Sequence, residues 1–169
     1  MSSTIVIGLL RREHGGAPRY LMVRESDGRI QFPGGKLKSQ ETLRNALIRE
    51  VKEEVGLDVL VDTQPVLVER VYELCKGDYE KRYDEQLLHF FRMKILPSSP
   101  FEQLNSNVGI WVGLGNIEDF IEQVPFDNYL IITKWDHLNP GNRFVVPPGF
   151  IDSPKAEDRV VIREIVKRP

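Results

Sequence analysis

The segment REVKEE, residues 49–54, concentrates three carboxylates within six residues and constrains the chain more than any other stretch. In a helix, residues three and four apart share a face, so Glu50, Glu53 and Glu54 would point the same way. Like charges at this spacing repel by about 0.2–0.5 kcal/mol per pair. A shared cation would offset that repulsion, and hard divalent cations such as Mg²⁺ prefer carboxylate oxygens.

The surrounding residues predict a helix over 39–55, with Ser39 as its N-cap and Gly56 as its left-handed C-terminal residue. A solvated charged face, tied together by pairs such as Arg49 with Glu53, is the ordinary alternative to a metal site. Against it, the helical projection places Glu54 inside the apolar arc. That arc recurs every four residues at Leu43, Leu47, Val51 and Val55.

The helix and the loop before it resemble the Nudix box, G-x5-E-x7-R-E-U-x-E-E-x-G-U with U aliphatic, at every constrained position of residues 35–57. The resemblance implies an α/β class of fold, an α/β/α sandwich with a mixed β-sheet between helices. It also implies Mg²⁺-dependent attack of water on the pyrophosphate linkage of a nucleoside diphosphate joined to another group, with Mn²⁺ as a substitute cation. The glycines allow the backbone to approach a metal closely.

Roles for individual residues follow from the resemblance. Arg49 would orient the carboxylates and Glu41 would support them from the helix start, and with Glu50 they form the predicted catalytic set. Three carboxylates and one backbone carbonyl would bind the metal, namely Glu50, Glu53, Glu54 and Gly34.

The general base stays open between Glu50 and a downstream residue. The nucleotide-sanitising branch of the family has a glutamate immediately before a tryptophan at the start of a late strand. Here that place reads Gly109-Ile110-Trp111, without the glutamate. Glu85 and Glu102 are the downstream alternatives to Glu50.

Four further residues are candidates for substrate contacts. Arg24 and Lys36 are cations beside and within the loop, where they could meet phosphates or remain ordinary surface charges. Phe32 could stack on a base or pack beneath the loop. Asn128 lies roughly where the sanitising branch recognises a purine, although its position after Asp127 also suits a helix N-cap.

The substrate class is therefore left between a nucleoside triphosphate, a dinucleoside polyphosphate and a nucleotide-sugar. The alternative is a binding function rather than an enzymatic one: a Nudix domain that binds a nucleotide or sugar-nucleotide as a sensor, without turnover. The complete box favours hydrolysis, because a pure binder has no need of all three helix carboxylates.

Composition excludes several partners. The 169 residues carry a formal net charge of −2, so no basic field predicts binding to duplex nucleic acid or to a membrane surface. Cys75 is the only cysteine, which excludes an internal disulfide and favours a reducing, cytoplasmic setting. The short apolar run near the start reads as a strand rather than a signal segment.

The length predicts one domain over 1–169, with a core of about 1–139 and a C-terminal extension of about 140–169 that could build a homodimer. Residues 75–84 read as a long charged loop and 97–107 as another loop. The last run, 158–167, fits both helical and strand periodicity and receives no assignment. Strands are predicted over 4–10, 19–24, 66–73, 85–96 and 109–114, and further helices over 117–123 and 127–138.

Overall fold

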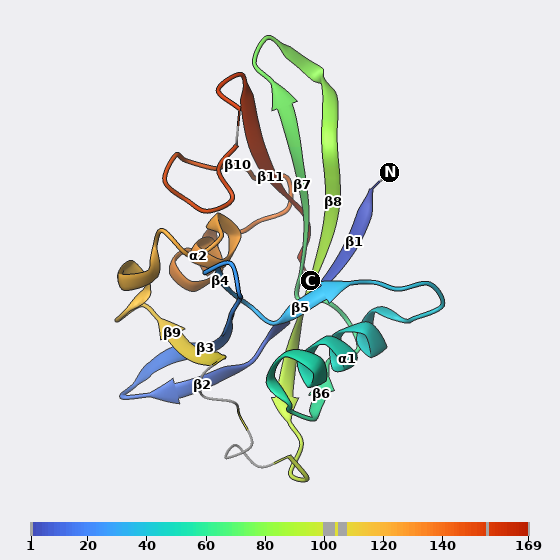
Figure 1. Cartoon of the computed structure of the whole chain (residues 1–169), viewed down its shortest axis with the longest axis vertical. Helices are drawn as coiled ribbons and strands as arrows, with labels where there is room; N and C mark the ends of the chain where they lie inside the picture. The colour runs from blue at the N-terminus through green and yellow to red at the C-terminus, as the bar shows by residue number, and fades with distance from the viewer. Residues whose placement is uncertain (1, 100–103, 105–107, 155, 169) are drawn as a thin grey trace.

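The structure is a computed structural model that describes residues 2–99, 104, 108–154 and 156–168. Its strands form two sheets (Figure 1). The strands are β1 (Ser3–Leu9), β2 (Arg11–His14), β3 (Ala17–Arg24), β4 (Ile30–Gln31), β5 (Gly34–Lys36), β6 (Val59–Val61), β7 (Leu67–Cys75), β8 (Asp78–Ile95), β9 (Gly109–Gly113), β10 (Arg143–Val145) and β11 (Arg159–Lys167). The helices are α1 (Leu43–Val55) and α2 (Phe126–Thr133), with 3₁₀ turns η2 (Ile117–Phe120) and η3 (Trp135–His137).

The larger sheet is mixed. Its strands run in the order β10-β11-β7-β8-β1-β5, with β6 also paired to β8. Strand β1 pairs with β8 in parallel and with β5 antiparallel. The smaller sheet has the order β2-β3-β4, with β9 paired to β3. The antiparallel pairing of β1 with β5 places the glycine-rich loop of the box directly at the edge of the larger sheet.

The two faces of the larger sheet are covered by different helices. Successive residues of a strand point to opposite faces, so Val6 of β1 packs in the cluster that contains Leu47 of α1. Ile7 packs in the other cluster, with Phe90 of β8 and Ile131 of α2. The predicted α/β/α sandwich with a mixed sheet between helices is confirmed.

Helix α1 begins later than the sequence predicted. Its N-cap is Thr42, whose hydroxyl accepts a hydrogen bond from the Asn45 N–H at 3.2 Å, so the assignment of Ser39 was wrong. Gln40 has φ of 67°, a left-handed conformation that cannot continue a helix. The C-terminal prediction is confirmed: Gly56 has φ of 78° and its N–H donates to the Lys52 carbonyl.

The hairpin of β7 and β8 replaces most of the long loop predicted over 75–84. Cys75 pairs with Asp78 across a tight turn in which Gly77 has φ of 95°. Polar residues continue as strand here because arginines stack on tyrosines: Arg82 lies 4.2 Å from the ring centroid of Tyr72. Charge alone was therefore a poor indicator of a loop.

The C-terminal tail adds two strands to the larger sheet. Strand β11, which received no assignment, pairs antiparallel with β7 over most of its length. Val161 and Ile165 of β11 are buried in the α2-side core. The two later predicted helices are shorter than expected, because 117–123 contains only η2 and 127–138 divides into α2 and η3.

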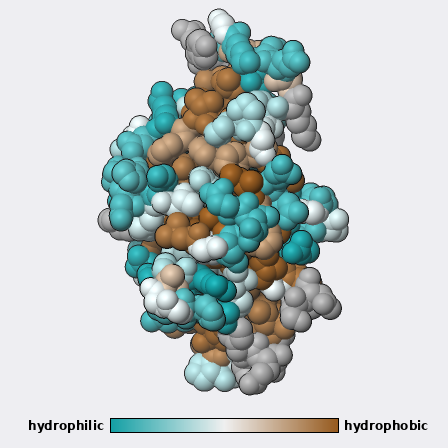
Figure 2. Space-filling view, turned by 90° about the vertical axis from the view of Figure 1, so that its left-hand side faces the viewer, coloured by the Kyte–Doolittle hydropathy of each residue, from teal (hydrophilic) through white to brown (hydrophobic). Residues whose placement is uncertain are grey.

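The surface carries no large apolar face in this view: Figure 2 shows hydrophobic residues interspersed with hydrophilic ones on the side that includes α2. Among the described residues, the large hydrophobic side chains that remain exposed come from separate elements: Ile48, Leu60, Leu114, Val145, Ile151 and Val166. No helix in the described part of the chain is long and apolar enough to cross a membrane. A homodimer stays a prediction.

Candidate active site

One guanidinium holds three carboxylates at the start and middle of α1. Arg49 contacts Glu41 and Glu50, each at 2.6 Å, and Glu53 at 3.3 Å. It also donates to the Lys36 carbonyl at 3.3 Å, which ties the helix to the loop before it. We call these four side chains, Glu41, Arg49, Glu50 and Glu53, the α1 cluster. Hydrogen bonding from Arg49 lowers the pKa of Glu41 to about 2.

Glu54 lies near Glu50 and Glu53 but is more buried than Glu53, and it is not among the carboxylates that pair with the arginine of the α1 cluster. Its carboxylate accepts a hydrogen bond from the Gly34 N–H at 3.0 Å. Burial raises the pKa of Glu54 to about 8, and the nearby charges of Glu25, Glu50 and Glu53 act in the same direction. Glutamate side chains are therefore crowded at this site.

Gly35 lies against Glu50. A Cβ at Gly35 would stand 2.4 Å from the Glu50 carboxyl carbon and 2.6 Å from both oxygens. Only glycine leaves the carboxylate in that position, which explains why this place of the box is a glycine.

These oxygens suit a divalent cation. No group of three His, Cys, Asp or Glu side chains in the described part of the chain is already arranged as a metal centre. The donor set nonetheless fits Mg²⁺ or Mn²⁺, which prefer oxygen, because several carboxylates meet beside a glycine loop that admits close approach. Glu50, Glu53 and Glu54, with the Gly34 carbonyl, are the residues that would hold the cation.

A cavity of about 390 Å³, the first cavity, opens on the other side of this loop. Ligand sites typically enclose about 300–1,000 Å³. Strands β1 and β8, the loop, the start of α2 and the tail line it: Ile5, Ile7, Arg29, Gln31, Phe32, Gly34, Gly35, Lys36, Gln86, Leu88, Pro125, Asp127, Asn128, Ile151, Asp152 and Arg163. Gly34 and Gly35 therefore separate the carboxylates from a space of ligand size.

Asn128 is buried at this cavity and does not cap α2. The N-cap position belongs to Pro125, with no side-chain cap, so the N-cap interpretation of Asn128 was wrong. Its Oδ1 instead accepts from the Phe32 N–H at 2.8 Å, and its Nδ2 donates to Asp127 at 2.8 Å. The second amide hydrogen has no acceptor among the described residues.

A second guanidinium holds three carboxylates beneath the first cavity. Arg163 of β11 contacts Asp152 at 2.6 Å, Asp127 at 3.2 Å and Glu69 at 3.3 Å. We call these four side chains the buried cluster. Burial raises the pKa of Glu69 to about 8 and also raises the pKa of Asp127, although the charge of Arg163 opposes both shifts.

The predicted substrate residues divide between the cavity and the surface. Phe32 and Lys36 line the first cavity. Phe32 is buried and packs edge-on against Tyr20, with ring centroids 5.8 Å apart. Arg24 is exposed at the end of β3 and is not among the lining residues, so its role stays a prediction.

The alternatives for the general base are not equally placed. Glu85 forms ion pairs with Arg70 at 3.6 Å and Arg82 at 3.7 Å on the β7–β8 hairpin. Glu102 lies outside the described residues.

Comparison with known proteins identifies the family of the chain. The model of the NUDIX domain matches residues 1–131. The chain therefore belongs to the Nudix hydrolase family.

Among curated relatives, an 8-oxo-dGTP diphosphatase of Proteus vulgaris is 51% identical over 41 residues, which are 24% of this chain and 34% of that protein. An enzyme of the same description from Escherichia coli (strain K12) is 35% identical over 57 residues, 31% of this chain and 43% of that protein. The chain thus spans less than half the length of either relative.

Solved structures share the fold at low identity. A Nudix family hydrolase from Clostridium perfringens superposes with a TM-score of 0.54 at 14% identity, covering 80% of this chain and 97% of that one. A MutT protein from Methanosarcina mazei Go1 gives 0.53 at 21%, covering 80% and 94%.

Proposed function

We propose that the chain hydrolyses a pyrophosphate bond of a nucleoside triphosphate, using Mg²⁺ held by the α1 carboxylates. The observation that carries this proposal is that the same two glycines border both the α1 carboxylates and the first cavity. Gly34 and Gly35 contact Glu54 and Glu50 on one side and line the first cavity on the other. A nucleotide in that cavity would bring its phosphates to the carboxylates across the loop.

Each residue has a task in this proposal. A bound divalent cation would neutralise phosphate charge and acidify a water molecule. Arg49 holds Glu50 and Glu53 in position. Lys36, which lies within the box and lines the first cavity, is the cation that could meet a phosphate. Glu50, which lies against Gly35, is the proposed proton acceptor, because Glu85 lies on the β7–β8 hairpin and is not among the residues that line the first cavity.

A purine base is the proposed occupant of the inner part of the cavity. The remaining amide hydrogen of Asn128 can donate to a base, and Phe32 supplies apolar surface beside it. The curated relatives described as 8-oxo-dGTP diphosphatases make an oxidised guanine nucleotide the first substrate to try. The expected setting is the cytoplasm, with no duplex nucleic acid or membrane as partner.

The test is a panel of 8-oxo-dGTP, the common nucleoside triphosphates, dinucleoside polyphosphates, ADP-sugars and capped RNA, each with Mg²⁺ or Mn²⁺. Release of phosphate or pyrophosphate is the measurement. Hydrolysis of a triphosphate is expected. If every compound stays intact with both metals, the proposal is wrong.

Glu53→Gln separates hydrolase from sensor. The variant should lose turnover by orders of magnitude while its thermal unfolding stays close to that of the unmodified protein, because Glu53 is 56% exposed. Glu122→Gln, at another exposed carboxylate outside the cavity lining, is the matched control and should keep full activity. If the chain is a sensor, the unmodified protein, Glu53→Gln and Glu122→Gln would all bind nucleotide and none would hydrolyse it.

A further inference from the structure

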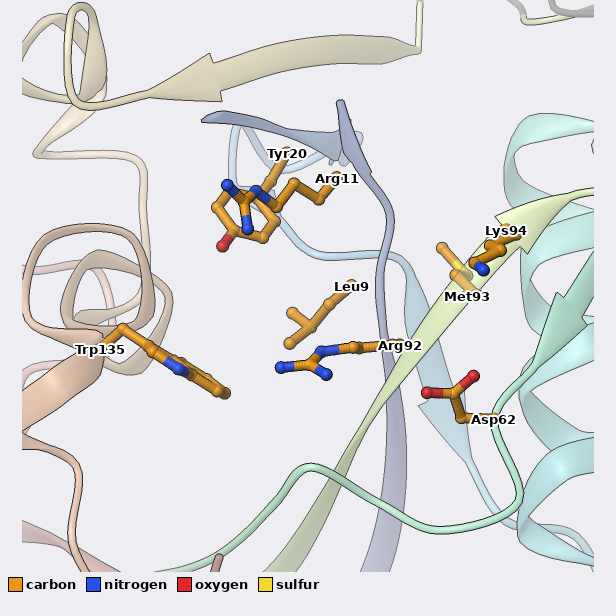
Figure 3. Close-up of a pocket in the computed structure, with 8 residues that line it drawn as sticks. All are labelled: Leu9, Arg11, Tyr20, Asp62, Arg92, Met93, Lys94 and Trp135. Carbon is orange, nitrogen blue, oxygen red and sulfur yellow. The ribbon is translucent and has the colours of Figure 1, made fainter. Parts of the chain in front are cut away.

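A second cavity, of about 520 Å³, lies on the same face of the larger sheet as the first, and Figure 3 shows the side chains around it. Its lining comes from β1, β2, β3, β8, the segment after β6, and η3: Leu9, Arg11, Tyr20, Asp62, Arg92, Met93, Lys94 and Trp135. None of these residues lines the first cavity. The space is as large as known ligand pockets of about 300–1,000 Å³.

The register of the sheet explains where this cavity forms. Along β1, Ile5 and Ile7 line the first cavity and Leu9, two residues further on the same face, lines the second. Helix α2 joins the two places, since Asn128 near its start lines the first cavity and Trp135, just beyond its end, lines the second.

The face of strand β8 that lines both cavities changes from apolar to positively charged between them. Leu88 lines the first cavity and Phe90 is buried in the α2-side core. The next residues of that face, Arg92 and Lys94, are exposed cations. The face of a strand that packs on a core is normally apolar along its whole length. Two cations in a row on this face therefore mark the place where the sheet is no longer covered and meets solvent.

Positive charge predominates in this cavity. Three cations, Arg11, Arg92 and Lys94, face a single carboxylate, Asp62. The Arg92 side chain has no hydrogen-bond or ion-pair partner within the described ranges, and Figure 3 shows it extending toward Trp135. A guanidinium without a carboxylate partner is well suited to a phosphate, which it can bind through two parallel hydrogen bonds.

An aromatic ring stands opposite that guanidinium. Trp135 is half-buried and projects from η3 into the cavity (Figure 3). Arg168 fixes it, because its guanidinium lies 4.6 Å from the ring centroid and donates to the Trp135 carbonyl at 2.8 Å. Tyr20 adds a phenol near Arg11 and Arg92, whose charges act to lower its pKa while burial raises it.

We propose that the second cavity binds a nucleotide at a site separate from the reaction centre, with the base against Trp135 and the phosphate on Arg92 and Arg11. The pairing of an indole with the Arg92 guanidinium, which has no carboxylate partner among the described residues, matches a planar aromatic ring that carries a phosphate; Arg11, which also contacts Glu13 at 2.6 Å, adds positive charge beside it. Base–aromatic stacking tolerates any base, because every base presents a flat π face, so the site recognises nucleotides as a class.

Calorimetric titration of the full chain with GMP in EDTA tests this proposal without any need for turnover. Arg92→Gln and Trp135→Leu should each weaken one binding event about tenfold or more, the loss of one charged or stacking contact. Asn128→Ala should leave that event unchanged. Lys134→Gln, an exposed neighbour of Trp135 outside the lining, is the matched control and should also leave it unchanged.

Two outcomes would overturn the second site. One is wild-type affinity for GMP in both Arg92→Gln and Trp135→Leu. The other is equal affinity for inorganic phosphate and GMP, since that would leave no role for the indole. Arg11→Gln, at a side chain 56% exposed, repeats the test with little risk to folding. Failure of the hydrolysis panel would not change these results.

Discussion

The α1 cluster and the buried cluster have the same composition, three carboxylates on one arginine, and differ in burial and in origin. The Arg49 side chain is 20% exposed and its partners lie within residues 41–53. The Arg163 side chain is 6% exposed and its partners come from β7, the start of α2 and the segment before β11. One cluster can be reached by a cation from solvent, and the other is mostly buried: three of its four side chains are at most 6% exposed, and Asp152 is 20% exposed.

This difference indicates different tasks for the same chemistry. A carboxylate group open to solvent can bind a metal ion while its arginine partner holds it in position, whereas a buried one depends on its arginine alone, because unpaired buried charge is very costly. The α1 cluster is thus suited to reaction, and the buried cluster joins the tail to the sheet beneath the first cavity.

Removal of the buried guanidinium should have the largest effect. Arg163→Met leaves three carboxylates without their cation and should lower the free energy of unfolding by about 3–5 kcal/mol, measured by urea denaturation. Arg143→Met is the control, because Arg143 is 61% exposed and bridges Glu164 on the same tail. Similar losses in the two variants would contradict the assignment of the buried cluster to stability.

The equivalent change in the α1 cluster should act on activity. Arg49→Met releases Glu50 and Glu53, and loss of a residue that orients metal ligands typically costs about 10–100-fold in metal affinity or activity. Its urea midpoint should shift far less than that of Arg163→Met. This prediction would be contradicted if Arg49→Met strongly lowered the free energy of unfolding while the folded fraction kept normal turnover.

The stability of the protein should also depend on pH. The ordinary carboxyl pKa is 4.5 and that of Glu69 is about 8 when folded, so between these values the folded protein keeps a proton that the unfolded chain has lost. Stability should therefore fall as pH rises from about 4.5 to about 8, by up to about 1.4 kcal/mol per pH unit for one proton. Glu69→Gln should reduce this slope in urea titrations at several pH values, and an unchanged slope would show that Glu69 is not the titrating group.

The α1 cluster and the buried cluster also differ in how far the sequence alone could predict them. The α1 helix, its Gly56 terminus and the box residues were predictable because their interactions lie within one helix and one loop. The start at Thr42 was missed because it depends on the left-handed backbone of Gln40.

The buried cluster was missed for a physical reason. Arg163 and Glu69 are 94 residues apart and become neighbours only when β11 pairs with β7. The periodicity of 158–167 fitted helix and strand equally, so nothing local identified that pairing. One signal was present: a charged residue in the middle of a valine- and isoleucine-rich run, as Arg163 is, needs a buried partner.

Truncation after Asn139, a natural way to ask whether the tail builds a homodimer, would remove Arg163 and the whole of β11. The mass of the intact chain in solution is therefore the sounder measurement of oligomeric state.

The central claim, that the α1 carboxylates hold a divalent cation, is tested most directly by Mn²⁺ titration followed by electron paramagnetic resonance. Glu53→Gln and Glu54→Gln should each weaken Mn²⁺ binding by an order of magnitude or more, while Glu69→Gln in the buried cluster should leave it unchanged. Wild-type Mn²⁺ affinity in both α1 variants would contradict the account.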